Sequence, residues 1–160
     1  MRSIFVFLVL LFMFFFRTAH AGDHADSQNI SGLLRFEASD SVAATMDRLE
    51  AAITQRGFKV FARIDHQAGA RSIDMDLRPT QLLIFGNPEG GTPLMQNAQT
   101  MGIDLPLKAL VYEAENGQVF VAFNDPHFLV HRHSLKNGEA ITKKMTGLIT
   151  ALAKAATASD

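Results

Sequence analysis

The chain has 160 residues, with 15 Lys and Arg against 16 Asp and Glu, six His and no Cys, and its formal net charge is −1. A chain without a basic excess lacks the charge that nucleic-acid binding requires, so we expect no nucleic-acid partner. The absence of Cys excludes disulfides, thiol catalysis and Cys-ligated zinc, so the fold must rest on its hydrophobic core.

The N-terminus has the three parts of a secretory signal peptide. Arg2 precedes an unbroken apolar run over residues 4–16, and Ala19 and Ala21 form a small-residue cleavage signal. As a helix this run would be roughly 20 Å long, whereas an uncleaved membrane anchor, the alternative interpretation, must cross roughly 30 Å. We therefore predict a signal peptide over residues 1–21 and an exported protein, periplasmic or extracellular, with no stable membrane insertion after cleavage.

The remainder is predicted to form one domain. Cleavage would remove 21 of the 160 residues and leave 139; Arg2 and Arg17 leave too, so 13 basic residues face 16 acidic ones, a net charge of −3. Residues 22–31 are polar and are predicted to be a flexible N-terminal tail. Residues 32–156 are predicted to be a single domain, because they are enough for one hydrophobic core.

The first half of this domain predicts two strands around a helix. A strand is expected at residues 33–36, and Ser41 is a suitable N-cap for a helix that ends before Gly57. The helix is indicated by apolar residues at helical spacing, namely Val42, Met46, Leu49 and Ile53. Residues 58–64 alternate, which predicts a strand with positions 58, 60, 62 and 64 on its buried side.

The middle of the chain is rich in turn signals. We expect a short helical piece over residues 67–72 and a central strand over residues 81–85. Residues 86–91 contain three Gly and one Pro, which is typical of a turn. Thr92 followed by Pro93 predicts the start of a helix over residues 94–101.

The last part predicts a hairpin and two helices. Strands are expected at residues 107–113 and 119–123, joined by a turn at Asn116 and Gly117. A short helix capped by Asp125 and a long helix over residues 138–155 follow. The predicted fold class is α+β, a mixed, largely antiparallel sheet of about five strands with helices packed on one face.

Five phrases of the chain carry a family resemblance. They are RIDH at 63–66, LRPT at 77–80, IFGNP at 84–88, GTPLM at 91–95 and LPLK at 105–108. In this order and spacing they resemble the family called domain of unknown function 302, from about Val42 to Leu135. The resemblance implies a small α+β domain, often exported and sometimes fused to other modules. It implies no activity, because the family name itself assigns none.

The turn at residues 86–93 is the first candidate site. Glycines allow close approach of a ligand to the backbone, and free N–H groups at a helix start favour an anion. The plainer interpretation is a strand-to-helix turn that needs Gly and Pro for its dihedral angles. The predicted ligand-binding residues are His66, Arg78, Asn87, Gly91, Thr92 and Lys108, if the fold brings them together.

Histidines supply the other candidates. His66 follows Asp65 at a strand end and is the best candidate for a catalytic general base, although a polar strand terminus explains it equally well. His127 and His131 are four residues apart on one predicted helix face, and His133 is close by. Imidazole ligands favour zinc or copper, so these three predict a metal site, with an ordinary surface cluster as the alternative.

The sequence therefore favours a binding domain over an enzyme. The leading hypothesis is an exported domain that binds a small ligand, an anion or a partner protein, and whose strands are also compatible with a homodimer. The alternative is a periplasmic metal-binding protein, and an enzyme with a His general base ranks last because no nucleophile or acid partner is apparent. The sequence requires no cofactor, and zinc or copper is the cofactor it is compatible with.

Overall fold

A five-stranded sheet forms the centre of the computed structural model, which describes residues 32–158. Its strand order is β1-β5-β4-β3-β2, and all four pairings are antiparallel. The predicted signal peptide and tail lie outside the described residues. The strands are β1 (Leu33–Ala38), β2 (Lys59–Asp65), β3 (Thr80–Gly86), β4 (Leu107–Glu113) and β5 (Val119–Asn124).

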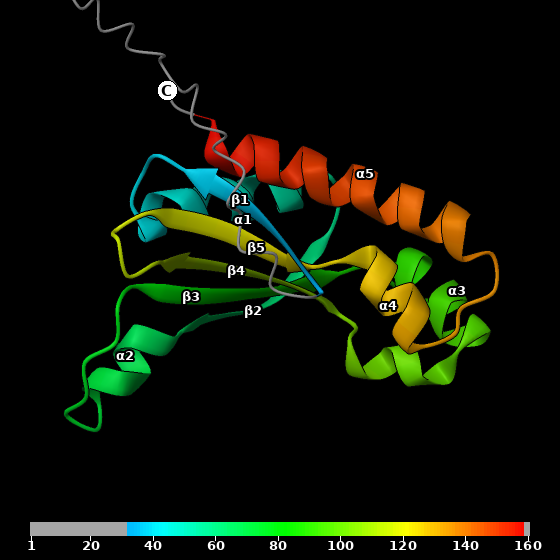
Figure 1. Ribbon diagram of the computed structural model, residues 1–160, viewed down its shortest axis with the longest axis horizontal. Coiled ribbons are helices and arrows are strands. Elements are labelled where there is room, and N and C mark those ends of the chain that lie inside the picture. The colour runs from blue at the N-terminus through cyan, green and yellow to red at the C-terminus, as the bar shows by residue number, and fades with distance from the viewer. Residues whose placement is uncertain (1–31, 159–160) are drawn as a thin grey trace, which may run out of the picture.

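Five α-helices and one 3-10 helix accompany the sheet in the described part of the chain. Figure 1 shows α1 and α5 together on one side of the sheet, with α1 passing behind the strands and α3 and α4 beyond one end. The predicted α+β class is therefore confirmed. The helices are α1 (Val42–Gln55), α2 (His66–Arg71), α3 (Pro88–Asn97), η1 (Gln99–Ile103), α4 (Pro126–Arg132) and α5 (Gly138–Thr157).

The main core lies between the sheet and the helices α1 and α5. The predicted stripe of α1 faces this core, since Met46, Leu49 and Ile53 are fully buried. Leu83 and Phe85 of β3 meet them from the sheet. A second, smaller cluster joins η1, α4 and α5 through Met101, Leu129, Leu135 and Met145.

Several predicted helix boundaries are confirmed by the caps. The hydroxyl of Ser41 accepts a hydrogen bond from the Ala44 amide at the start of α1. Gly57 follows α1 with a φ of +77°, the left-handed region that favours glycine. Asp125 Oδ1 accepts from the His127 amide at 2.8 Å and so caps α4.

A bulge in β2 changes the predicted alternation. Val60 pairs with Phe85 and Ala62 pairs with Ile84, so Phe61 is an extra residue between two pairings. Residues 60 and 62 therefore lie on opposite faces, and the prediction that 58, 60, 62 and 64 share one buried side is wrong. Ile64 is 38% exposed as a result.

The same bulge turns Arg63 toward α1. Its Nη1 donates to Asp47 Oδ1 at 2.6 Å and to Glu50 Oε2 at 3.1 Å. Burial by itself would lower the pKa of Arg63, but the hydrogen bonds and charges of the two carboxylates outweigh it and raise the pKa above its usual value. This arginine thus ties the edge strand to the helix layer.

The helix predicted to start at Thr92 and Pro93 begins earlier. Asn87 is the N-cap and Pro88 the first residue of α3, which places Pro93 inside the helix. Asn87 Oδ1 accepts from the Gly90 amide at 2.7 Å. Asn87 and Pro88 therefore have the roles of N-cap and first-turn proline that were predicted for Thr92 and Pro93. The predicted single helix to residue 101 is divided into α3 and η1 at Ala98.

Among residues 32–158, no helix is both long and apolar enough to span a bilayer.

Candidate ligand-binding groove

A large groove opens at one end of the sheet, which we call the groove end. It has a volume of about 1020 Å³ and lies between α3, the start of β4 and the first half of α5. Residues 86–95 form one continuous wall, and the Leu105–Pro106 peptide bond beside them is cis. The other lining residues are Phe58, Phe61, Asn97, Leu105, Pro106, Leu107, Lys136, Asn137, Ile141, Lys144, Met145 and Leu148.

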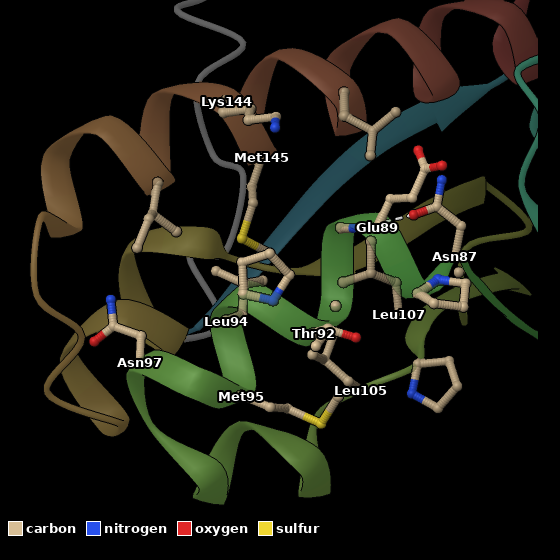
Figure 2. Close-up of a pocket in the computed structure, with 18 of the residues that line it drawn as sticks. Asn87, Glu89, Thr92, Leu94, Met95, Asn97, Leu105, Leu107, Lys144 and Met145 are labelled. Carbon is tan, nitrogen blue, oxygen red and sulfur yellow. Dashed lines mark hydrogen bonds between the residues drawn. The ribbon is translucent and has the colours of Figure 1, made fainter.

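The interior of the groove is apolar. Figure 2 shows Met145 of α5 reaching down toward Leu94 of α3, with Leu107 of β4 on the other side of the space. Phe58 and Leu107 also pack against the main core, and Met145 belongs to the second cluster. Both hydrophobic clusters of the domain therefore end in this groove, which makes its floor a continuation of the core.

The amides at the rim are occupied by structural hydrogen bonds. Asn87 caps α3 through its side-chain oxygen. Asn97 Nδ2 donates to the Lys136 carbonyl and its Oδ1 accepts from the Lys136 amide, both at 2.9 Å. This pair of bonds fastens the end of α3 to the segment that leads into α5, so it sets the width of the groove.

Two lysines supply the positive charge of the lining. Lys136 precedes α5 and Lys144 lies within it, while Glu89 is the acidic residue of the lining. Within residues 32–158, neither lysine ammonium group takes part in a hydrogen bond or ion pair. In Figure 2 Glu89 lies beside Asn87, on the opposite side of the groove from Asn97. The rim is therefore electrically asymmetric.

The wall formed by α3 has an unusual composition for a helix. Gly90, Gly91 and Pro93 lie within its ten residues, and each of these residue types disfavours a helix interior. No residue of α3 is fully buried. A Cβ on Gly91 would lie 3.6 Å from Leu105 Cδ1, within ordinary contact distance. The glycines thus keep this wall free of side chains at the cost of helix propensity.

Three of the six predicted ligand-binding residues line the groove. Asn87, Gly91 and Thr92 are in its α3 wall, as the turn at residues 86–93 suggested. Lys108 follows the lining residue Leu107, but its Nζ donates to the carbonyls of Asp104 and Pro106 at 3.3 and 3.2 Å. Lys108 is therefore beside the groove without lining it.

His66 and Arg78 lie at the opposite end of the sheet, which we call the α2 end. His66 begins α2, and Arg78 precedes β3 and donates from Nε to the Glu113 carbonyl at 3.1 Å. The seven residues of β3 separate Arg78 from Asn87, which corresponds to roughly 20 Å. The prediction that His66, Arg78, Lys108 and the turn share one pocket is therefore wrong.

The Asp65–His66 pair has a structural explanation. Asp65 Oδ1 accepts a hydrogen bond from the Ala68 amide at 2.9 Å and so caps α2. His66 is exposed and follows the cap. Neither residue lines the groove, and the catalytic role predicted for His66 stays a prediction.

The three histidines of the predicted metal site are divided between surface and interior. His127 and His131 are exposed on α4, whereas the His133 side chain is only 4% exposed. Asp125, the nearest carboxylate in sequence, is used as a cap. Among residues 32–158, no group of three His, Asp or Glu side chains is arranged to hold a metal ion. The zinc or copper site stays a prediction.

His133 instead belongs to a buried hydrogen-bond network that sequence reasoning did not find. Its Nε2 lies 2.7 Å from Asp104 Oδ2, and its Nδ1 lies 2.9 Å from Thr100 Oγ1. Arg132 Nη1 approaches the same carboxylate oxygen at 3.4 Å. Asp104 and His133 are 29 positions apart, and no spacing pattern relates them. None of these residues lines the groove, so we interpret the network as the support that joins η1 to α4 beneath it.

Comparison with known proteins identifies the family. The model of a family described as Domain of unknown function DUF302 matches residues 34–152. The fold is similar to the crystal structure of an uncharacterized conserved DUF302 protein from Bacillus stearothermophilus, with a TM-score of 0.70 and 22% identity over 78% of this chain and 98% of that one.

Longer proteins also contain a related segment. The chain is 46% identical over 119 residues to "Fluoride-specific ion channel FluC 1" of Brucella suis biovar 1 (strain 1330), covering 73% of this chain and 47% of the relative. A "Fluoride-specific ion channel FluC 2" of Brucella melitensis biotype 1 matches over the same length, which is 44% of that protein. The chain thus spans slightly less than half of these relatives. The family match covers most of the chain, and the protein belongs to the DUF302 family.

Proposed function

We propose that this protein is a binding domain whose groove takes a small, mainly apolar organic molecule that carries an anionic group. The observation that carries the proposal is the groove itself, with its volume of about 1020 Å³ and its lining from α3, β4 and α5. Small-molecule sites in proteins are typically concave, mostly apolar and of this order of size. A few polar groups at the rim then fix the orientation of the ligand.

The apolar part of the ligand would replace water over the groove floor. Leu94, Leu107 and Met145 present aliphatic and thioether groups without polar atoms that need a partner. Burial of apolar surface contributes roughly 25 cal/mol per Å², so the affinity should grow with the hydrocarbon size of the ligand. Met145 and Met95 are flexible, which favours tolerance for ligands of different shape.

The charged side chains at the rim of the groove indicate that the ligand carries a negative charge. Lys136 and Lys144 come from different segments and both line the groove, so an anionic group bound there would be attracted by a positive charge. Glu89 stands beside Asn87, away from Asn97, and would repel the same group. This asymmetry favours one orientation, with the anionic end toward the lysines.

Titration with the amphipathic probe 1-anilinonaphthalene-8-sulfonate tests the proposal, because the probe combines aromatic rings with a sulfonate. We expect saturable fluorescence enhancement and a severalfold weaker affinity for Lys144→Gln. Lys143→Gln removes the same charge one residue away, at a position that does not line the groove, and should leave the affinity unchanged. Equal effects of both variants would contradict the proposed anion contact.

A second pair of variants tests the apolar interior. Gly91→Leu places a side chain against Leu105 and fills the groove, so we expect it to abolish probe binding. Gly69→Leu is the control, because Gly69 is also helical and has open space around it in α2. Retention of probe binding by a folded Gly91→Leu variant would exclude this groove as the binding site.

We also propose export through residues 1–21, supported by the order of charge, apolar run and small residues at the N-terminus. A native mass spectrum of protein purified from its own host measures this directly. The expected mature chain begins at Gly22, and a bound ligand would add mass that disappears on denaturation. An uncut N-terminus would refute the export proposal while leaving the groove proposal intact.

A second candidate function is that of an accessory domain for an ion channel. It is favoured by the relatives named fluoride-specific ion channels, which are 46% identical to this chain over slightly less than half of their length. Fluoride tolerance of cells with and without this protein tests the candidate. Identical tolerance in both would count against it.

A further inference from the structure

We propose that the sheet face opposite α1 and α5 is an interface for a second copy of this chain. This open face is defined by the strand registers. Residues 83, 85, 109, 111, 121 and 123 are buried beneath the helices, so their neighbours along each strand point to the other side. The three inner strands place Leu82, Ile84, Leu110, Tyr112, Phe120 and Ala122 there. This inference is independent of the groove.

The centre of the open face is apolar and continuous across the strands. Leu82 pairs with Leu110, and Leu110 pairs with Ala122. Tyr112 pairs with Phe120, and their rings stack at 5.7 Å between centroids. Antiparallel sheets that expose one face to water normally alternate apolar and polar residues. Here the central positions of both faces are apolar, and on the open face of the inner strands the cation Lys108 lies at the start of β4, where it pairs with Ile84. This pattern indicates that the second face is also covered.

Charges of both signs lie around this centre, which is compatible with contact between two copies of the same patch. Arg35 and Glu37 are both on the edge strand β1, at open-face positions that pair with Ala122 and Phe120. Lys59 and Lys108 add positive charge at positions that pair with Gly86 and Ile84. The Arg35 guanidinium covers part of the centre, because it lies 5.1 Å from the centroid of the Phe120 ring and donates to the Tyr112 hydroxyl at 3.3 Å. A two-fold axis applies the same patch to itself, so a patch that contains both signs can be complementary to its own copy. The net charge, −1 for the whole chain and −3 for the predicted mature chain, adds little repulsion between two copies.

The area of the open face approaches what a stable dimer buries per partner when the α2 end is added to it. Five strands about 4.8 Å apart and roughly 20 Å long cover roughly 500 Å², whereas a stable interface needs about 800 Å² per partner. Ile73, Met75 and Leu77, between α2 and β3, are 66%, 60% and 43% exposed. Figure 1 shows α2 and this segment extending past the strands. They supply the additional apolar surface for a second copy.

Sedimentation or light scattering over about 1 to 100 µM tests the proposal on the full mature chain. We expect twice the monomer mass for the wild type and the monomer mass for Leu110→Lys, which places a charge at the centre of the open face. Ile103→Lys is the control, since Ile103 is 70% exposed on η1 and away from this face. The control should remain a dimer.

A second variant keeps the test valid if Leu110→Lys does not fold. Ile64 is a partly exposed open-face residue on the edge strand β2, so Ile64→Lys is expected to fold and to weaken dimerisation at least severalfold. A wild type that stays monomeric at the highest concentration would overturn the proposal. So would a dimer that persists unchanged in folded variants at both positions.

Discussion

The two ends of the sheet contain similar sequence signals and different structures. Each has polar and turn-forming residues next to a strand: residues 65–80 at the α2 end and residues 86–106 at the groove end. At the α2 end, α2 has no buried residue, and its polar groups satisfy local caps and carbonyls. At the groove end, α3, η1, α4 and α5 meet over a second hydrophobic cluster.

This difference shows what a turn-rich segment needs in order to form a candidate binding site. Local capping is present at both ends, since Asp65 caps α2 and Asn87 caps α3. Only the groove end has a second wall, because α5 returns from a distant part of the chain and places Met145 opposite Leu94. A binding site therefore depends on convergence of separate segments, and the local signal marks only one of its sides.

The largest contrast is expected between the two histidines His133 and His66. His133→Ala should lower the free energy of unfolding by about 3 kcal/mol, because it removes a buried ring and leaves Asp104 without its closest partner. His66→Ala, at an exposed position, should change it by less than about 0.5 kcal/mol. Urea unfolding monitored by circular dichroism measures both. Similar values for the two variants would remove the structural role assigned to the network.

The next contrast compares glycines at the two ends. A Cβ on Gly138 would collide with Val130, so Gly138→Ala should destabilise the domain by about 2 kcal/mol and disturb the junction of α4 with α5. Gly69→Ala meets open space inside α2 and should stabilise it by roughly 0.5 to 1 kcal/mol. The melting temperatures of both variants show directly whether each substitution stabilises or destabilises the domain. Destabilisation by Gly69→Ala would show that the α2 end is more tightly packed than its geometry indicates.

A smaller effect is expected from Asn97. Asn97→Ala removes both hydrogen bonds to Lys136 and should cost about 1 kcal/mol, since these groups are partly exposed to water. Amide hydrogen exchange should accelerate in α3, which no longer has its C-terminal fastening. Exchange in α1 is the internal control and should not change. Unchanged exchange in α3 would mean that its contacts with η1 hold it without the asparagine.

Much of the fold follows from the sequence because local patterns decide it. The stripe of α1, the Asn116–Gly117 hairpin and the cap of Asp125 all depend on residues within a few positions of one another. The start of α3 was misplaced because two successive residue pairs have the same cap and proline chemistry. The bulge at Phe61 was missed because the β2 sequence alternates without interruption.

For the site, the sequence by itself determined that residues 86–93 are a glycine- and proline-rich segment between a strand and a helix, and it identified Asn87, Gly91 and Thr92. Only the tertiary structure decided that His66 and Arg78 lie at the other end of β3 and that Met145, Lys136 and Lys144 complete the groove. It also decided that His133 pairs with Asp104 in the interior. Local conformation depends on neighbouring residues, whereas the meeting of distant segments depends on how the whole sheet and its helices bury their apolar faces.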